Sequence, residues 1–505
     1  MSYKDEYAEQ IEGQFYDLEN RIIADIVRRI RKTGEITSTA DYQIGRLAAL
    51  GYSSADIEDA IKSALGATYP QMFELYDKVA CWEYVRNKKL YEQINAEFIP
   101  FEDNAWLQNL LRAVKQQTKG TLQNFAQTMG VVDTVNGQMT FLPLTQFYQK
   151  TLDAAVLDIA SGAFDYNSVL KRTVATLSKS GIRTIDYASG YTSRLPVAVR
   201  RAVMTGVSQL TGEISEYNAE KLGTDHFEID RHDGARPSHR PWQGKVWSKD
   251  ELVSVCGLGT VTGLKGANCY HEYYPFILGV SERNYTDEEL KRLDALEDEK
   301  KPFKGKEYNS YEARQKQRQM ETAMRAQRTK VRALEEGGAD RNDIIIAKAR
   351  YQGQLAEYKR FSSAMELKPH MERVYIDGLG RVALSDKAFK KYQEDAIIKQ
   401  ELRQFMRRGK INIPARAIPY RNLDFDHEHI NKERSHDVTR QEALHWIESA
   451  SFSMTVWNGH FERYYSHEGA VYVDMWDKKI RTAYRKDEFK AGVQQSMEVM
   501  KNHGR

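Results

Sequence analysis

The chain has 505 residues, 41% of them hydrophobic and 29% charged, so it can bury several cores of ordinary size. Its formal net charge of +3 is too small to indicate nucleic-acid binding by charge alone. Three cysteines argue against a disulfide framework and fit a reducing compartment. The N-terminus lacks a signal-peptide core, and no apolar run reaches membrane-spanning length. We therefore expect synthesis in a cytoplasm and no membrane anchor.

Residues 1–224 have helical periodicity along most of their length. The pattern predicts two short helices within residues 37–65, separated at Gly51. Further helices are predicted at 103–129, 144–161, 166–180 and 194–221. Two short helices about a glycine turn are typical of a DNA-binding helix-turn-helix, but these lack a basic recognition face. A helical packing unit is therefore the better interpretation.

The composition changes in residues 225–285, which are rich in Gly, Trp, His and Tyr. This pattern predicts a small α+β module of short strands and loops. Residues 286–380 then predict a charged helical hairpin and connector, with a break at 337–340. Its apolar seam is narrow, so the hairpin needs a neighbouring surface to be stable.

The C-terminal part begins with a linker helix at 381–408. Residues 409–505 predict a helix with Thr439 as its N-cap, followed by alternating segments at 452–457, 464–476 and 478–484. A helix with an antiparallel sheet is a compact α+β unit. The fold class is therefore multidomain and predominantly α, with α+β modules.

The central module also contains imidazoles and thiols, the usual ligands of zinc. The candidate ligands are His239, Cys256, Cys269 and His271. The region has no C-x2-C pair, and its spacing matches no standard zinc finger. The sequence therefore favours a loop core held by hydrogen bonds, with no metal and no cofactor.

The same region carries a long motif. Residues 232–246 read H-D-G-A-R-P-S-H-x-x-W-Q-G-K-V, and residues 263–279 read G-x-x-G-x-N-C-Y-H-x-x-x-P-F-x-x-G. Together they resemble the signature of the phage minor capsid protein 2 family, within the broader MuF-like head-morphogenesis proteins, and the resemblance extends over about residues 1–380. It implies a structural protein made in the host cytoplasm and packaged inside a tailed-phage head near the portal. The implied partners are portal and major capsid proteins, with several copies per virion and packaged DNA nearby.

Histidines concentrate near the C-terminus, where seven of the twelve lie at or after position 427. Metal-free RNA cleavage needs a base for the 2′-hydroxyl proton, an acid for the leaving oxygen and groups that hold the phosphate. Histidine suits both proton transfers near neutral pH. On residue types alone, a histidine-rich surface without activity is the stronger interpretation.

A second resemblance changes that balance. D-F-x-H-E-H-I-x-x-x-R-S-H at 424–436 and T-A-Y at 482–484 resemble phage-borne relatives of the barnase, EndoU, colicin E5/D and RelE nucleases. The resemblance implies a metal-independent ribonuclease toxin domain acting on RNA, with His429 or His436 as general acid or base. It also implies that Arg434 binds phosphate and that Thr482 and Tyr484 face the scissile group.

An alternative is a DNA-binding packaging or ejection factor with an inert C-terminal domain. The near-neutral charge argues against this role, because phosphate neutralisation needs a local excess of Lys and Arg. The sequence leaves open whether the C-terminal domain is an active enzyme.

Overall fold

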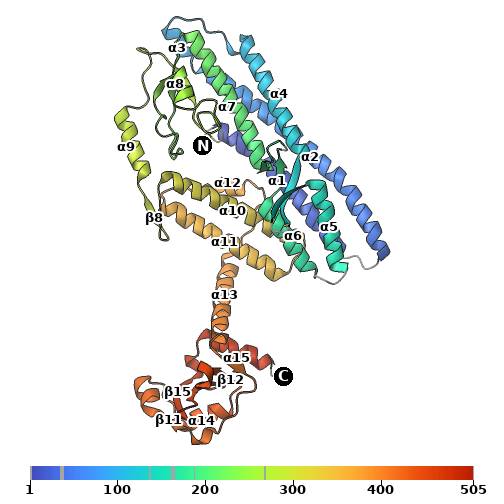
Figure 1. Ribbon diagram of the computed structural model, residues 1–505, viewed down its shortest axis with the longest axis vertical. Helices are drawn as coiled ribbons and strands as arrows, with labels where there is room; N and C mark the ends of the chain where they lie inside the picture. The colour runs from blue at the N-terminus through green and yellow to red at the C-terminus, as the bar shows by residue number, and fades with distance from the viewer. Residues whose placement is uncertain are drawn as a thin grey trace. The chain divides into compact units, whose positions relative to one another are not determined.

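A computed structural model describes residues 3–34, 39–135, 138–160, 165–186, 188–266 and 269–503 (Figure 1). The chain divides into two compact units, Met1–Ala383 and Leu384–Arg505. The first is mostly helical with small sheets, and the second is a sheet with helices on its faces, which confirms the predicted fold class.

Long helices make most of the N-terminal unit. They are α1 (Tyr3–Gly34), α2 (Thr39–Val85), α4 (Ala105–Gln127), α5 (Leu144–Ala160), α6 (Tyr166–Ser180), α7 (Leu195–Leu222), α10 (Ser310–Glu336) and α11 (Arg341–Ala364). Shorter helical segments are α3 (Lys88–Gln93), η1 (Phe101–Asp103), α8 (Lys249–Ser254), α9 (Asp287–Asp298) and α12 (Met371–Tyr375). In α1 the isoleucines Ile22, Ile23, Ile26 and Ile30 are buried in the core, together with residues of α2, α4 and α7.

Helix α2 corrects one prediction. Gly51 does not separate two helices, because α2 runs without a break from Thr39 to Val85 and passes through Pro70 as well. The cost of about 1 kcal/mol for a helical glycine is small beside the packing of the same helix, which buries Leu75 and Tyr76 completely. Residues 39–65 therefore contain no helix-turn-helix, while residues 37 and 38, like residue 161 of the predicted 144–161 helix, lie outside the described ranges.

A four-stranded sheet interrupts the region predicted as purely helical. Its strands are β1 (Met129–Val135), β2 (Gln138–Pro143), β3 (Arg183–Ile185) and β4 (Thr192–Arg194), in the order β2-β1-β3-β4. All neighbouring strands are antiparallel. Strands β3 and β4 have three residues each, too few to show an alternating pattern in the sequence.

The central module is a three-stranded antiparallel sheet in the order β6-β5-β7. Its strands are β5 (His226–Ile229), β6 (Val246–Ser248) and β7 (Tyr273–Phe276). Phe227, Trp242 and Leu264 form its own small core. The Ser215 hydroxyl of α7 donates a hydrogen bond to the Tyr273 carbonyl at 2.6 Å, so the module is fixed on α7.

The charged hairpin is formed by α10 and α11, which turn at Gly337 and Gly338 as predicted. A two-stranded sheet, β8 (Lys301–Phe303) and β9 (Lys306–Tyr308), precedes it. The hairpin packs on the helices of its own unit, because Met324, Val331 and Tyr351 are part of the main core. This is the neighbouring surface that its narrow apolar seam requires.

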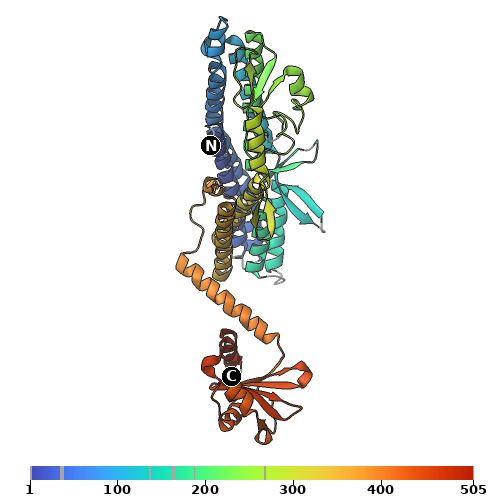
Figure 2. The ribbon, with the colours of Figure 1, turned by 90° about the vertical axis from the view of Figure 1, so that its left-hand side faces the viewer.

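The C-terminal unit is a six-stranded sheet in the order β10-β12-β13-β14-β15-β11 (Figure 2). Its strands are β10 (Lys410–Asn412), β11 (Asp424–Phe425), β12 (Phe452–Val456), β13 (Phe461–Tyr465), β14 (Gly469–Asp474) and β15 (Lys479–Arg485). Only the short β11 pairs in parallel, with β15. The segment predicted at 464–476 contains the end of β13, a turn and the whole of β14.

Helices cover both faces of this sheet. Helix α14 (Arg440–Glu448) starts at the predicted N-cap Thr439 and packs through Trp446 on one face. Helices α13 (Asp386–Met406) and α15 (Ala491–His503) supply Phe405 and Val493 to the core on the other face. The remaining helical turns are η2 (Tyr420–Asn422), η3 (Glu428–Glu433), η4 (Trp457–Gly459) and η5 (Lys486–Glu488).

Candidate functional site

His429 lies on η3, a single π-helical turn. Its Nδ1 is 2.7 Å from Oε2 of Glu433, one turn further along, and its side chain is 33% exposed. The carboxylate therefore accepts a hydrogen bond from Nδ1–H and fixes the orientation of the ring.

His436 follows η3 in a tight turn in which Ser435 and Asp437 both have positive φ. Its Nδ1 is 2.7 Å from Oε2 of Glu488 on η5, so it is oriented as His429 is. The His436 ring also lies 5.7 Å from the Tyr484 ring, measured between centroids. The structure thus brings two of the predicted site residues together.

The other predicted residues differ in their surroundings. Thr482 and Tyr484 are two apart on β15 and so point to the same face of the sheet. The Tyr484 hydroxyl is 2.9 Å from that of Tyr472, and burial raises the pKa of Tyr484, which keeps it protonated. Arg434 is exposed at the end of η3.

A polar hollow of about 560 Å³ adjoins His429 and was missed by sequence reasoning. It is lined by Asp426, Glu428, His429, Glu433, Phe461, Asp474 and Arg481. Lys479 lies 2.9 Å from Asp426, and this hydrogen bond is the main cause of the lowered pKa of that carboxyl. Arg481 is the extra residue of an irregularity between β14 and β15, which no sequence pattern announces.

The central module gathers three of the four candidate metal ligands. The Nδ1 atoms of His239 and His271 are 3.4 Å apart, and the Cys269 Sγ lies 3.8 Å from the first and 3.6 Å from the second. Cys256 is not part of this group: it is buried in the module core, where desolvation raises its thiol pKa to about 12.

The second nitrogen of each imidazole is also engaged. Nε2 of His239 lies 2.9 Å from the Thr262 carbonyl oxygen, and Nε2 of His271 lies 2.9 Å from Oε1 of Gln243. Burial lowers the pKa of His239 and lowers that of His271 to about 3, so both rings are neutral at pH 7. Both therefore carry their proton on Nε2, because the partner there is an oxygen acceptor.

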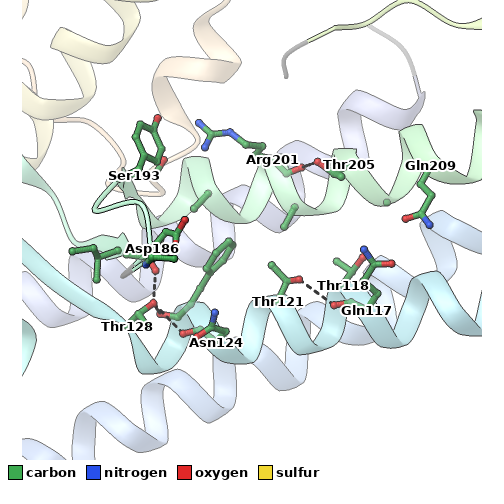
Figure 3. A pocket seen from close by; sticks show the side chains of 18 residues that line it. Gln117, Thr118, Thr121, Asn124, Thr128, Asp186, Ser193, Arg201, Thr205 and Gln209 are labelled. Atoms are coloured by element: carbon green, nitrogen blue, oxygen red, sulfur yellow. Dashed lines mark hydrogen bonds between the residues drawn. The ribbon is translucent and has the colours of Figure 1, made fainter. Parts of the chain in front are cut away.

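A second hollow of about 560 Å³ lies between α4, α7 and the β3–β4 hairpin (Figure 3). Hydroxyl and amide groups line much of it, yet several already have partners. The hydroxyls of Thr121, Thr128 and Thr205 donate to carbonyls of their own helices. We assign no chemistry to this hollow.

Fold and site together define a two-part protein: a helical body with a His/Cys cluster in its central module, and a separate sheet unit with carboxylate-paired histidines. The family model for phage minor capsid protein 2 matches residues 2–361. The chain belongs to the phage minor capsid protein 2 family, which confirms the first resemblance. No curated protein and no solved structure matches the chain. Among the described residues, no helix is long and apolar enough to cross a membrane.

Proposed function

We propose that this chain is a minor structural component of a tailed-phage head. It is packaged inside the capsid near the portal, in several copies, and contacts portal and major capsid proteins. The family match supports this role, because it covers nearly all of the N-terminal unit, from residue 2 to residue 361. Mass spectrometry of purified particles tests it: we expect the full chain in the head fraction, and its absence from particles would contradict the proposal.

The second part of the proposal is that the C-terminal unit is a metal-independent endoribonuclease carried by the capsid module. The observation that supports it is the pairing of His429 with Glu433 and of His436 with Glu488. Neither Nε2 atom has a hydrogen-bond partner among the described residues. Each ring thus presents a usable nitrogen on a partly exposed surface.

The proposed reaction uses these two nitrogens in turn. One imidazole removes the 2′-hydroxyl proton as the oxygen attacks phosphorus, and the other protonates the 5′-oxygen as its bond to phosphorus breaks. The products are a 2′,3′-cyclic phosphate and a 5′-hydroxyl. Arg434 and Thr482 would hold the phosphate, and Tyr484 would position the His436 ring.

The test is expression of Leu384–Arg505 alone, because this unit has its own two cores. We expect toxicity in cells and RNA cleavage in the presence of a chelator. A matched control is His467→Ala, an exposed histidine in the turn between β13 and β14. A folded, harmless fragment that leaves RNA intact would overturn the nuclease proposal without touching the capsid assignment.

A further inference from the structure

We propose that His239, His271 and Cys269 form a binding site for a soft, tetrahedral divalent cation such as Zn²⁺ in the central module. The sequence favoured the opposite conclusion, because the three ligands match no finger spacing. The structure instead places their three ligand atoms within 4.8 Å of one another.

The distances between ligand atoms are within about 0.2 Å of those that a zinc ion imposes. Zinc binds imidazole nitrogen at about 2.0–2.1 Å and thiolate sulfur at about 2.3 Å, with tetrahedral angles. Two nitrogens on one ion are then about 3.3–3.4 Å apart, and a nitrogen and a sulfur about 3.5–3.6 Å apart. The observed separations are 3.4 Å between the nitrogens and 3.6 and 3.8 Å from sulfur to nitrogen.

Hydrogen bonding alone does not explain this arrangement. Gln243 Oε1 accepts from the His232 backbone N–H at 3.1 Å, which fixes that amide so that His271 Nε2 must donate to it. Nε2 of His239 likewise donates to a backbone carbonyl. The Nδ1 lone pair of His239 therefore faces the Nδ1 lone pair of His271. The single thiol hydrogen of Cys269 can be donated to only one of them. A cation between them satisfies both nitrogens and the sulfur.

The outer contacts also fit a metal site. Metal-binding histidines usually donate their other ring N–H to an oxygen acceptor, which fixes tautomer and orientation, as both do here. The His232 ring is also close, with its centroid 5.0 Å from that of the His271 ring. However, its Nε2 lies 3.2 Å from Oδ2 of Asp230, so we do not count it as a ligand. We therefore assign the fourth position to a water molecule.

Binding would tie together segments that share only a small core. His239 lies in the loop between β5 and β6, and Cys269 and His271 lie just before β7. On binding, the Cys269 thiol loses its proton to solvent and the thiolate sulfur bonds the cation. The proposed ion thus cross-links two segments of the module and has a structural role, not a catalytic one.

The experiment uses the full-length chain, purified under reducing conditions and stripped with a chelator. After Zn²⁺ is added and excess removed, elemental analysis should find one zinc per chain. Co²⁺ in place of Zn²⁺ should give tetrahedral visible bands and a thiolate-to-cobalt charge-transfer band. Failure to retain zinc, or a cobalt spectrum without the sulfur band, would overturn the proposal.

A pair of cysteine variants locates the site. Cys269→Ala should abolish the charge-transfer band and reduce retained zinc at least tenfold. Cys256→Ala, which changes the other cysteine of the same module, should leave both unchanged. Equal zinc binding by Cys269→Ala and the parent chain would contradict the assignment, and the parent cobalt spectrum decides the question if this variant does not fold.

Discussion

The two units of the chain use the same residue type in opposite ways. His239 and His271 are 2% and 4% exposed, have no carboxylate on either nitrogen among the described contacts, and face each other through Nδ1. His429 and His436 are partly exposed, and each meets a glutamate at 2.7 Å. A carboxylate partner suits a ring that must gain and lose a proton, whereas converging neutral lone pairs suit a cation. The surroundings of a histidine, more than its presence, indicate its chemistry.

The largest effect is expected when both carboxylate-paired histidines of the C-terminal unit are removed. His429→Ala combined with His436→Ala should lower RNA cleavage by the isolated C-terminal unit about 10²–10⁴-fold, because each ring is proposed to supply one proton transfer. Gel-based cleavage rates measure this, with His467→Ala as the control. Full activity in the folded double variant would show that these histidines are not the acid and base.

The comparison also requires that the two units unfold independently. Arg328 and Asp377 form a fully buried ion pair in the N-terminal unit, at 2.7 and 2.8 Å. Asp377→Ala should destabilise that unit by about 3–5 kcal/mol, because it leaves a buried charge unpaired. Scanning calorimetry should show one transition moving and the other unchanged. A single transition that shifts as a whole would contradict the division.

Two buried glutamates sharpen the contrast between the units. In the N-terminal unit both carboxylate oxygens of Glu83 lack a hydrogen-bond partner among the described residues, and burial raises its pKa to about 7. In the C-terminal unit Glu462 accepts hydrogen bonds from Ser453, Thr455 and Asn412. The same change to glutamine should therefore have opposite effects.

The pKa of Glu83 is higher in the folded than in the unfolded chain, so the folded state is favoured when this carboxyl is protonated. This contribution to the free energy of unfolding is complete below about pH 4.5 and is lost as the pH rises through about 7. Glu83→Gln should then stabilise the N-terminal unit by up to about 3 kcal/mol at pH 8 and change little near pH 4.5. Glu462→Gln should cost about 1–3 kcal/mol, since an amide nitrogen replaces an acceptor. Denaturant unfolding at the two pH values measures both, and a pH-independent effect of Glu83→Gln would contradict the account.

The smallest effects come from a matched pair of helix caps. Thr439 caps α14 with Glu442, and Ser248 caps α8 with Glu251. Thr439→Ala should lower the stability of the C-terminal unit by about 1 kcal/mol, and Ser248→Ala should act only on the N-terminal unit. Thermal unfolding monitored for each transition separates them, and cross-effects would indicate coupled units.

Much of the fold could be predicted because long helices leave strong periodic signals. The predicted helix at 166–180 coincides with α6, and the glycines at 337–338 mark the hairpin turn. The four-stranded sheet was missed, although V-N-G-Q at 135–138 is a hairpin-type sequence flanked by alternating residues. The predicted break at Gly51 is wrong because tertiary packing of α2 outweighs one unfavourable residue.

The sites were harder to predict than the fold. Motif resemblance pointed to His429 and His436, but their partners Glu433 and Glu488 and the neighbouring Arg481 are set by a turn and by strand register. Likewise, the meeting of His239 with His271, 32 residues apart, depends on how a loop returns to β7. Such convergence is a property of the fold and leaves no spacing rule in the sequence.

The most direct test measures RNA cleavage by the full-length chain before and after a chelator removes bound metal. We expect zinc to be lost from the central module while the cleavage rate stays the same, because the proposed acid and base, His429 and His436, need no ion. Cleavage that disappears on chelation and returns with Zn²⁺ would contradict it, since the metal and the proton chemistry would then belong to one site.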